Sequence, residues 1–130
     1  MKQVTINGIE EFLRLIKKHK AEQPQGQLLF RGQKNDHALL PKICRLHVKG
    51  DLLNVESAIL QEFKRTNLLL IEYRRVMDDW DYLTLGQHYG LPTRLLDWSE
   101  NSLTALWFAT EPSVLHEKND AVVWILSASE

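Results

Sequence analysis

Gly90 and Pro92 interrupt the most densely patterned stretch of the sequence, the run Leu85–Ala109 (LGQHYGLPTRLLDWSENSLTALWFA). A glycine just after a helix ends it by adopting a left-handed conformation, and a proline nearby prevents the helix from continuing. Pro92 also restricts Leu91 to an extended conformation. The chain is therefore expected to end one helix near Gly90, cross a short extended corner and begin another helix beyond it.

The first and last helices are predicted from apolar spacing and capping residues. The first is expected at Ile9–Lys20, with Asn7 as its N-cap and Glu10 three residues further on, as in a capping box. The last is expected to cover Leu103–Thr110 after an N-cap at Ser99.

Two more helices are predicted in the middle of the chain. A long one should run from about Leu53 to about Val76, because apolar residues recur there at helical spacing. Asp51 or Asn54 is placed to cap it. A shorter helix is expected within Met77–Gly90, where Gly90 would close it.

Two apolar runs predict strands. Gln27–Gln33 is a short apolar run that contains a glycine near its end, and Asn119–Ser127 is rich in β-branched residues. Because two strands make a poor sheet, either further strands lie in the irregular segments or the chain is the front part of a larger domain. The predicted class is α+β, with several helices packed on a small mixed sheet. We expect residues 1–130 to be a single domain and the N-terminal part of a longer protein.

Composition excludes several classes of protein. The net charge is −1, so no strong field attracts nucleic acid or anionic lipid. No apolar run is long enough to span a membrane, and no signal peptide is visible at the N-terminus. With Cys44 as the single cysteine and no metal-binding His or Cys spacing, we expect neither an internal disulfide nor a metal site. The cytoplasm is the expected compartment.

Arg31 is the first candidate ligand residue, because it follows an apolar strand and precedes a glycine. A guanidinium at a strand end can clamp a phosphate or a carboxylate through two hydrogen bonds. Gly32 would let backbone or ligand approach closely. For the tripeptide taken alone, a surface arginine at a turn is the simpler explanation.

Gln87, His88 and Thr93 are the other candidate ligand residues, because they add polar groups to the corner around Gly90. His88 could equally be a hydrogen-bonded structural group. Arg94 and Asp97 are expected to form a buried ion pair that holds the corner, although Asp97 could instead belong to the site.

The aromatic side chains that follow this corner are expected to fill the core. They are Trp98, Trp107 and Phe108.

Taken together, LLFRGQ, LLPKICR and LTLGQHYGLPTRLLDWSENSLTALWFA resemble the FRG domain family, which is named for its Phe-Arg-Gly motif. The likeness covers about Leu28 to Ala109 and departs at Ser99, where the family usually has threonine. The resemblance implies a bacterial or phage setting, with roles in defence or toxin systems. The biochemical activity of the family is undefined.

The chain is more distantly similar to the front half of an ADP-ribosyltransferase fold, which leaves two functions open. One is a module that binds a nucleotide-like ligand or a partner protein. The other is an NAD-handling enzyme whose catalytic glutamate lies beyond residue 130, with Arg31 on the NAD phosphates and Asp97 or Glu56 as a substitute carboxylate. NAD is the one cofactor that this likeness implies.

Overall fold

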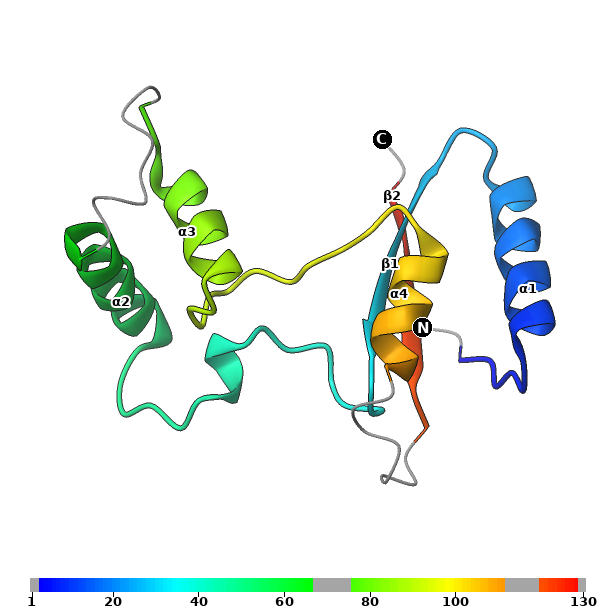
Figure 1. Cartoon of the computed structure of the whole chain (residues 1–130), viewed down its shortest axis with the longest axis horizontal. Helices are drawn as coiled ribbons and strands as arrows, with labels where there is room; N and C mark the ends of the chain where they lie inside the picture. The colour runs from blue at the N-terminus through cyan, green and yellow to red at the C-terminus, as the bar shows by residue number, and fades with distance from the viewer. Residues whose placement is uncertain (1–2, 67–75, 112–119, 129–130) are drawn as a thin grey trace. The chain divides into compact units, whose positions relative to one another are not determined.

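The computed structural model describes residues 3–66, 76–111 and 120–128, and it confirms the α+β class. The elements follow in the predicted order of helices and strands, with one added 3-10 turn (Figure 1): α1 (Ile9–Glu22), β1 (Gln27–Gln33), η1 (Ile43–Arg45), α2 (Leu52–Thr66), α3 (Asp79–His88), α4 (Ser102–Thr110) and β2 (Val122–Ala128).

The chain forms two compact units, which are described separately. Met1–His37 and Asp97–Glu130 form one, here called the sheet unit, and Ala38–Leu96 form the other, the helical unit. That residues 1–130 form a single domain stays a prediction. Within the described residues, no helix combines the length and the apolar composition needed to cross a membrane.

The sheet unit is built on β1, which pairs antiparallel with β2. Leu29 lies opposite Leu126 and Arg31 lies opposite Trp124. The other edge of β1 is bridged by Ser99, whose backbone exchanges two hydrogen bonds with Phe30, at 2.7 and 2.8 Å. The strand therefore runs between β2 and the segment that leads into α4.

One face of this strand pair carries the core of the sheet unit. Phe12 and Ile16 of α1, Leu28 and Phe30 of β1, and Ala105 of α4 form one buried cluster. Because side chains alternate along a strand, Gly32 points to this same face, whereas Leu29, Arg31 and Gln33 point to the opposite one.

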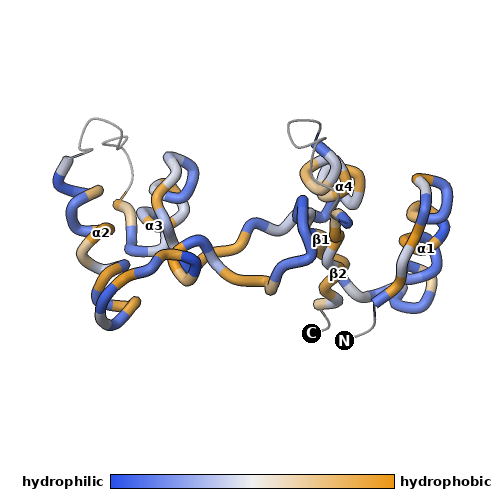
Figure 2. Tube along the Cα trace, turned by 90° about the horizontal axis from the view of Figure 1, so that it is seen from below, coloured by the Kyte–Doolittle hydropathy of each residue, from blue (hydrophilic) through white to orange (hydrophobic). Residues whose placement is uncertain are grey.

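Helix α4 packs on β1 through alanines. Ala105 and Ala109 are 2% and 4% exposed, whereas Trp107 and Phe108 are 54% and 53% exposed. The prediction that Trp107 and Phe108 fill the core is therefore wrong, although Trp98 is partly buried. The two rings instead contact each other edge to face, with centroids 5.0 Å apart. Figure 2 shows α4 as a mainly hydrophobic segment, and Leu103, Trp107 and Phe108 of this helix are exposed.

The exposure of Trp107 gives a stability prediction. Trp107→Ala should lower the free energy of unfolding by about 1 kcal/mol, because its ring keeps half of its contact with water. Phe30→Ala should cost about 3–5 kcal/mol, as expected for a fully buried aromatic ring. Urea denaturation of the two variants tests this order, and equal losses would place Trp107 in a core.

The helical unit packs α2 against α3 and η1. Its buried apolar side chains are Ile43, Leu60, Phe63 and Leu83. Asp78 caps α3 in a reciprocal capping box with Asp81. Gly90 follows α3 with a φ of 89°, and its N–H donates to the Gln87 carbonyl while that of Leu91 donates to the Gly86 carbonyl. These bonds form a Schellman motif, which confirms the predicted helix end.

Two predicted caps are wrong. The N-cap of α1 is Gly8, and Glu11 rather than Glu10 accepts a hydrogen bond from the backbone N–H of Asn7, at 3.1 Å. The N-cap of α4 is Asn101, whose side chain accepts from two backbone N–H groups. Ser99 is already engaged in the bridge to Phe30, which explains the shift.

The middle helix starts as predicted and is described as far as Thr66. Asp51 precedes α2, and its carboxylate accepts from the N–H of Leu53 at 3.3 Å. Val76, the predicted last residue, is not helical, and residues 67–75 lie outside the described residues.

Candidate functional site

The Phe-Arg-Gly tripeptide lies at the centre of the sheet unit, and two of its residues have structural roles. Phe30 is 1% exposed in the core. At Gly32, a Cβ atom would lie 1.9 Å from the carbonyl oxygen of Ala105. Gly32 is therefore required because the backbone of α4 passes close to β1. The sequence left open whether backbone or a ligand approaches this glycine, and the structure shows that it is backbone.

Arg31 lies on the face of β1 that α1 and α4 do not cover. Its Nη1 donates to the backbone carbonyl of Asp97 at 2.7 Å and lies 3.9 Å from the Asp97 carboxylate oxygen Oδ2. The Arg31 side chain is 20% exposed, and that of Asp97 is 81% exposed. The guanidinium is thus held in place by a backbone group and stays accessible to solvent.

Trp124 completes this face from β2. It lies directly opposite Arg31, so the two side chains leave the sheet on the same side. Within the described residues, the Trp124 indole N–H and the Gln33 amide oxygen are buried and have no hydrogen-bond partner. Buried polar groups normally have partners, so this face is chemically unlike the apolar face beneath α1 and α4.

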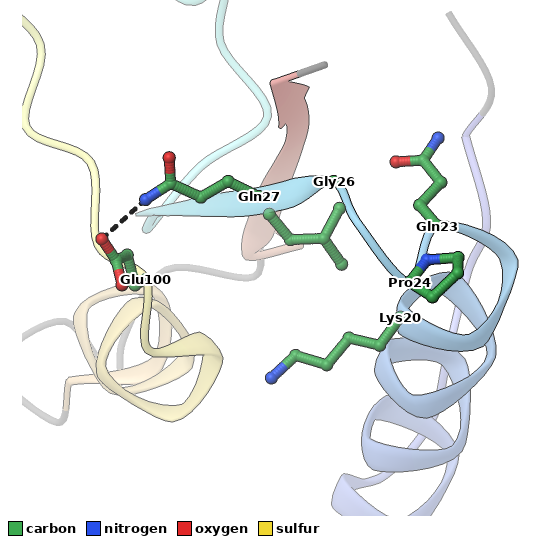
Figure 3. A pocket seen from close by; sticks show the side chains of 7 residues that line it. Lys20, Gln23, Pro24, Gly26, Gln27 and Glu100 are labelled. Carbon is green, nitrogen blue, oxygen red and sulfur yellow. Dashed lines mark hydrogen bonds between the residues drawn. The ribbon is translucent and has the colours of Figure 1, made fainter. Parts of the chain in front are cut away.

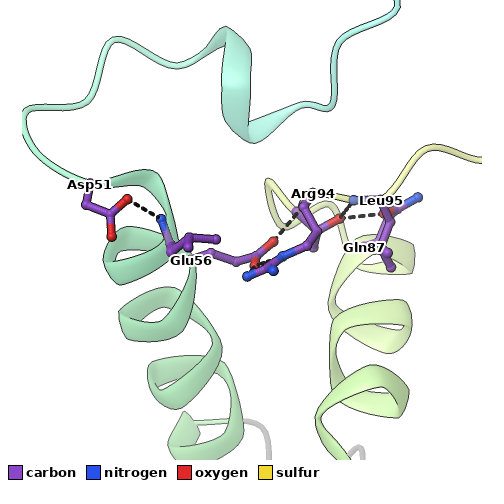
Figure 4. Close-up of polar contacts among 7 residues, drawn as sticks. Asp51, Glu56, Gln87, Arg94 and Leu95 are labelled. Atoms are coloured by element: carbon purple, nitrogen blue, oxygen red, sulfur yellow. Dashed lines mark hydrogen bonds and ion pairs between the residues drawn. The ribbon is translucent and has the colours of Figure 1, made fainter.

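Arg94 is paired in the helical unit, but with Glu56 rather than Asp97. Its Nε and Nη2 contact Glu56 Oε2, and its backbone N–H donates to Glu56 Oε1 at 2.6 Å (Figure 4). Glu56 is buried, whereas 45% of the Arg94 side chain is exposed. The predicted buried Arg94–Asp97 pair is therefore wrong in its partner and in its burial. The hydrogen bond to Glu56 raises the pKa of the Arg94 guanidinium, which stays charged.

Thr93 contacts Gln87, which is labelled in Figure 4, within the helical unit. The buried Thr93 hydroxyl donates to Gln87 Oε1 at 2.5 Å and accepts from the N–H of Leu95 at 3.3 Å. The Thr93 carbonyl accepts from the N–H of Ile43 at 3.4 Å. These contacts fix the corner after Pro92. His88 is exposed at the end of α3, edge to face with Tyr89.

The four predicted ligand residues thus divide between the units. Arg31 belongs to the sheet unit, and Gln87, His88 and Thr93 belong to the helical unit. Their convergence on one site stays a prediction. Trp124 was missed by the sequence analysis, because the pattern of an apolar strand does not reveal which residue lies opposite Arg31.

A separate hollow of about 260 Å³ lies between the end of α1 and the start of β1 (Figure 3). Lys20, Gln27 and Glu100 are among the residues that line it. The Gln27 amide already donates to Glu100 at 2.7 Å, and Arg31 is not part of the lining. This hollow therefore does not belong to the site around Arg31.

These observations define an α+β protein. Its Phe-Arg-Gly tripeptide supplies a core side chain, a partly exposed arginine and the glycine against which α4 packs. The family model described as the FRG domain matches residues 26–118, so the chain belongs to the FRG domain family. This match confirms the resemblance found in the sequence. No curated protein and no solved structure matches the chain.

Proposed function

We propose that this chain is a binding module for a nucleotide-like ligand, acting in the cytoplasm of a bacterium or in a phage context, with the ligand bound on the Arg31 face of the sheet unit. The observation that carries the proposal is the position of Arg31. It is a partly exposed guanidinium fixed by the Asp97 carbonyl, outside the core of the unit.

The chemistry of this face suits a phosphate joined to a planar group. A guanidinium offers paired N–H donors that match phosphate oxygens. The Trp124 ring, placed opposite on β2, offers a surface on which a base can stack. Gln87 and Thr93 already bond to each other, so we assign them to holding the corner of the helical unit.

Replacing Arg31 tests the proposal. Arg31→Lys keeps the charge but loses the planar fork, so affinity for adenosine diphosphate should fall roughly tenfold, and Arg31→Met should reduce it further. Isothermal titration calorimetry with adenosine diphosphate and inorganic pyrophosphate measures both, below the thermal midpoint of each variant.

Arg14→Met is the matched control, because Arg14 is an exposed arginine on α1, which covers the opposite face of the strand pair. Its removal changes the net charge equally and should leave the affinity unchanged. Absence of binding by the unsubstituted protein, or equal losses in Arg14→Met and Arg31→Met, would contradict a site at Arg31.

An NAD-cleaving transferase or hydrolase is the second candidate, since the Asp97 carboxylate lies 3.9 Å from Arg31. A carboxylate near the ribose would stabilise the positive charge that develops as the nicotinamide bond breaks. In this candidate Asp97 acts as the substitute for the catalytic glutamate expected beyond residue 130. Release of nicotinamide from NAD, lost in Asp97→Asn, would favour it over the binding module.

A further inference from the structure

We propose that Asp97 makes this site selective for ligands that carry sugar hydroxyl groups beside their phosphate, such as a ribonucleotide. The inference rests on the proposed binding at Arg31 and adds a class of ligand to it.

Asp97 contributes to the site through two separable groups. Its backbone carbonyl accepts the 2.7 Å bond from Arg31 Nη1. Its carboxylate forms an ion pair with the same atom, with Oδ2 3.9 Å from Nη1, and 81% of its side chain is exposed to solvent. The carbonyl therefore fixes the arginine, and the carboxylate stands beside it within reach of a bound molecule.

The charge of this carboxylate decides which ligands gain from it. An ionised carboxylate only accepts hydrogen bonds, so it attracts hydroxyl donors and repels a second anion. An acidic side chain binds ribose hydroxyls in the same way in dinucleotide-binding folds. Next to Arg31, it would therefore disfavour a bare phosphate and favour a phosphate attached to a sugar with free hydroxyls.

Three probes separate these contributions. Adenosine diphosphate carries both ribose hydroxyls, dideoxyadenosine diphosphate lacks both, and inorganic pyrophosphate is the anion alone. The unsubstituted protein should bind adenosine diphosphate about tenfold more tightly than the dideoxy compound, as expected for loss of hydrogen bonds to a charged group.

Asp97→Asn removes the carboxylate charge and leaves the backbone carbonyl that holds Arg31. In this variant the preference for adenosine diphosphate over its dideoxy analogue should fall to about threefold or less, because an amide oxygen is a weaker acceptor. Affinity for pyrophosphate should stay the same or rise. Glu10→Gln is the matched control, an exposed carboxylate on α1 whose loss should keep the full preference.

The outcomes distinguish this inference from the proposed function. Equal binding of the two nucleotides by the unsubstituted protein would overturn the role of Asp97 while leaving binding at Arg31 intact. An unchanged preference in Asp97→Asn would do the same. If none of the three probes binds, both the proposed function and this inference fail.

Discussion

Replacing Gly32 with alanine should lower the free energy of unfolding by about 3 kcal/mol or more, a large fraction of the stability of a small domain. A Cβ atom at this position would lie 1.9 Å from the carbonyl oxygen of Ala105 and 2.8 Å from the backbone nitrogen of Ala109. Both atoms belong to the backbone of α4, so no side-chain rotation relieves the overlap. The whole helix would have to move away from β1, and Phe30 would lose its contacts in the core.

Urea denaturation of Gly32→Ala measures this effect. Gly8→Ala is the control, since a Cβ atom at Gly8 meets nothing within 4 Å. Its loss of stability should stay below about 1 kcal/mol, as for other changes at an exposed helix cap. If Gly32→Ala were as stable as the unsubstituted protein, α4 would not be held against β1 as closely as the structure indicates.

The same close approach explains why the aromatic residues of α4 were misplaced by the sequence analysis. A strand that carries glycine at the contact accepts only small side chains from the helix above it, and Ala105 and Ala109 are spaced to supply them. Trp107 and Phe108 are consequently turned outward. Hydrophobicity alone predicts that a side chain prefers to be buried, but the local separation of the backbones decides which ones fit.

Periodicity predicted the elements well, because long amphipathic helices and apolar strands depend on local sequence. The strand Gln27–Gln33 has the predicted bounds. The partners of charged side chains depend on tertiary structure, and the sequence analysis chose the nearest one. Arg94 was assigned to Asp97, three residues away, whereas its partner Glu56 lies on α2, 38 residues away in the sequence.

One signal in the sequence does point to Glu56. It shares a single face of α2 with Leu60 and Phe63, at the spacing i, i+4 and i+7, and all three are buried. A buried carboxylate within an apolar stripe requires a hydrogen-bonding or oppositely charged partner. The identity of that partner follows only from the path of the chain after Pro92.

Removing Arg94 should destabilise the helical unit more than its exposed position suggests. Arg94→Met leaves the buried Glu56 carboxylate with the backbone N–H of residue 94 but without the guanidinium. Breaking a buried pair from one side costs about 3–5 kcal/mol, and we expect about 3 because 45% of the Arg94 side chain is exposed to water.

Glu56→Gln should also destabilise, by about 2 kcal/mol, since the new amide group directs N–H donors at the donors of Arg94. The double variant Glu56→Gln with Arg94→Met removes both the unpaired charge and this clash, so its loss should be smaller than the sum of the single losses by about 1.5 kcal/mol or more. Urea denaturation of the four proteins gives this coupling energy.

The matched cycle pairs Arg94→Met with Asp97→Asn and should give a coupling below about 0.5 kcal/mol, because the Asp97 carboxylate lies beside Arg31 instead. A strong coupling of Arg94 to Asp97 and a weak one to Glu56 would mean that the corner after Pro92 is held by the local pair in solution, and that Glu56 is buried for another reason.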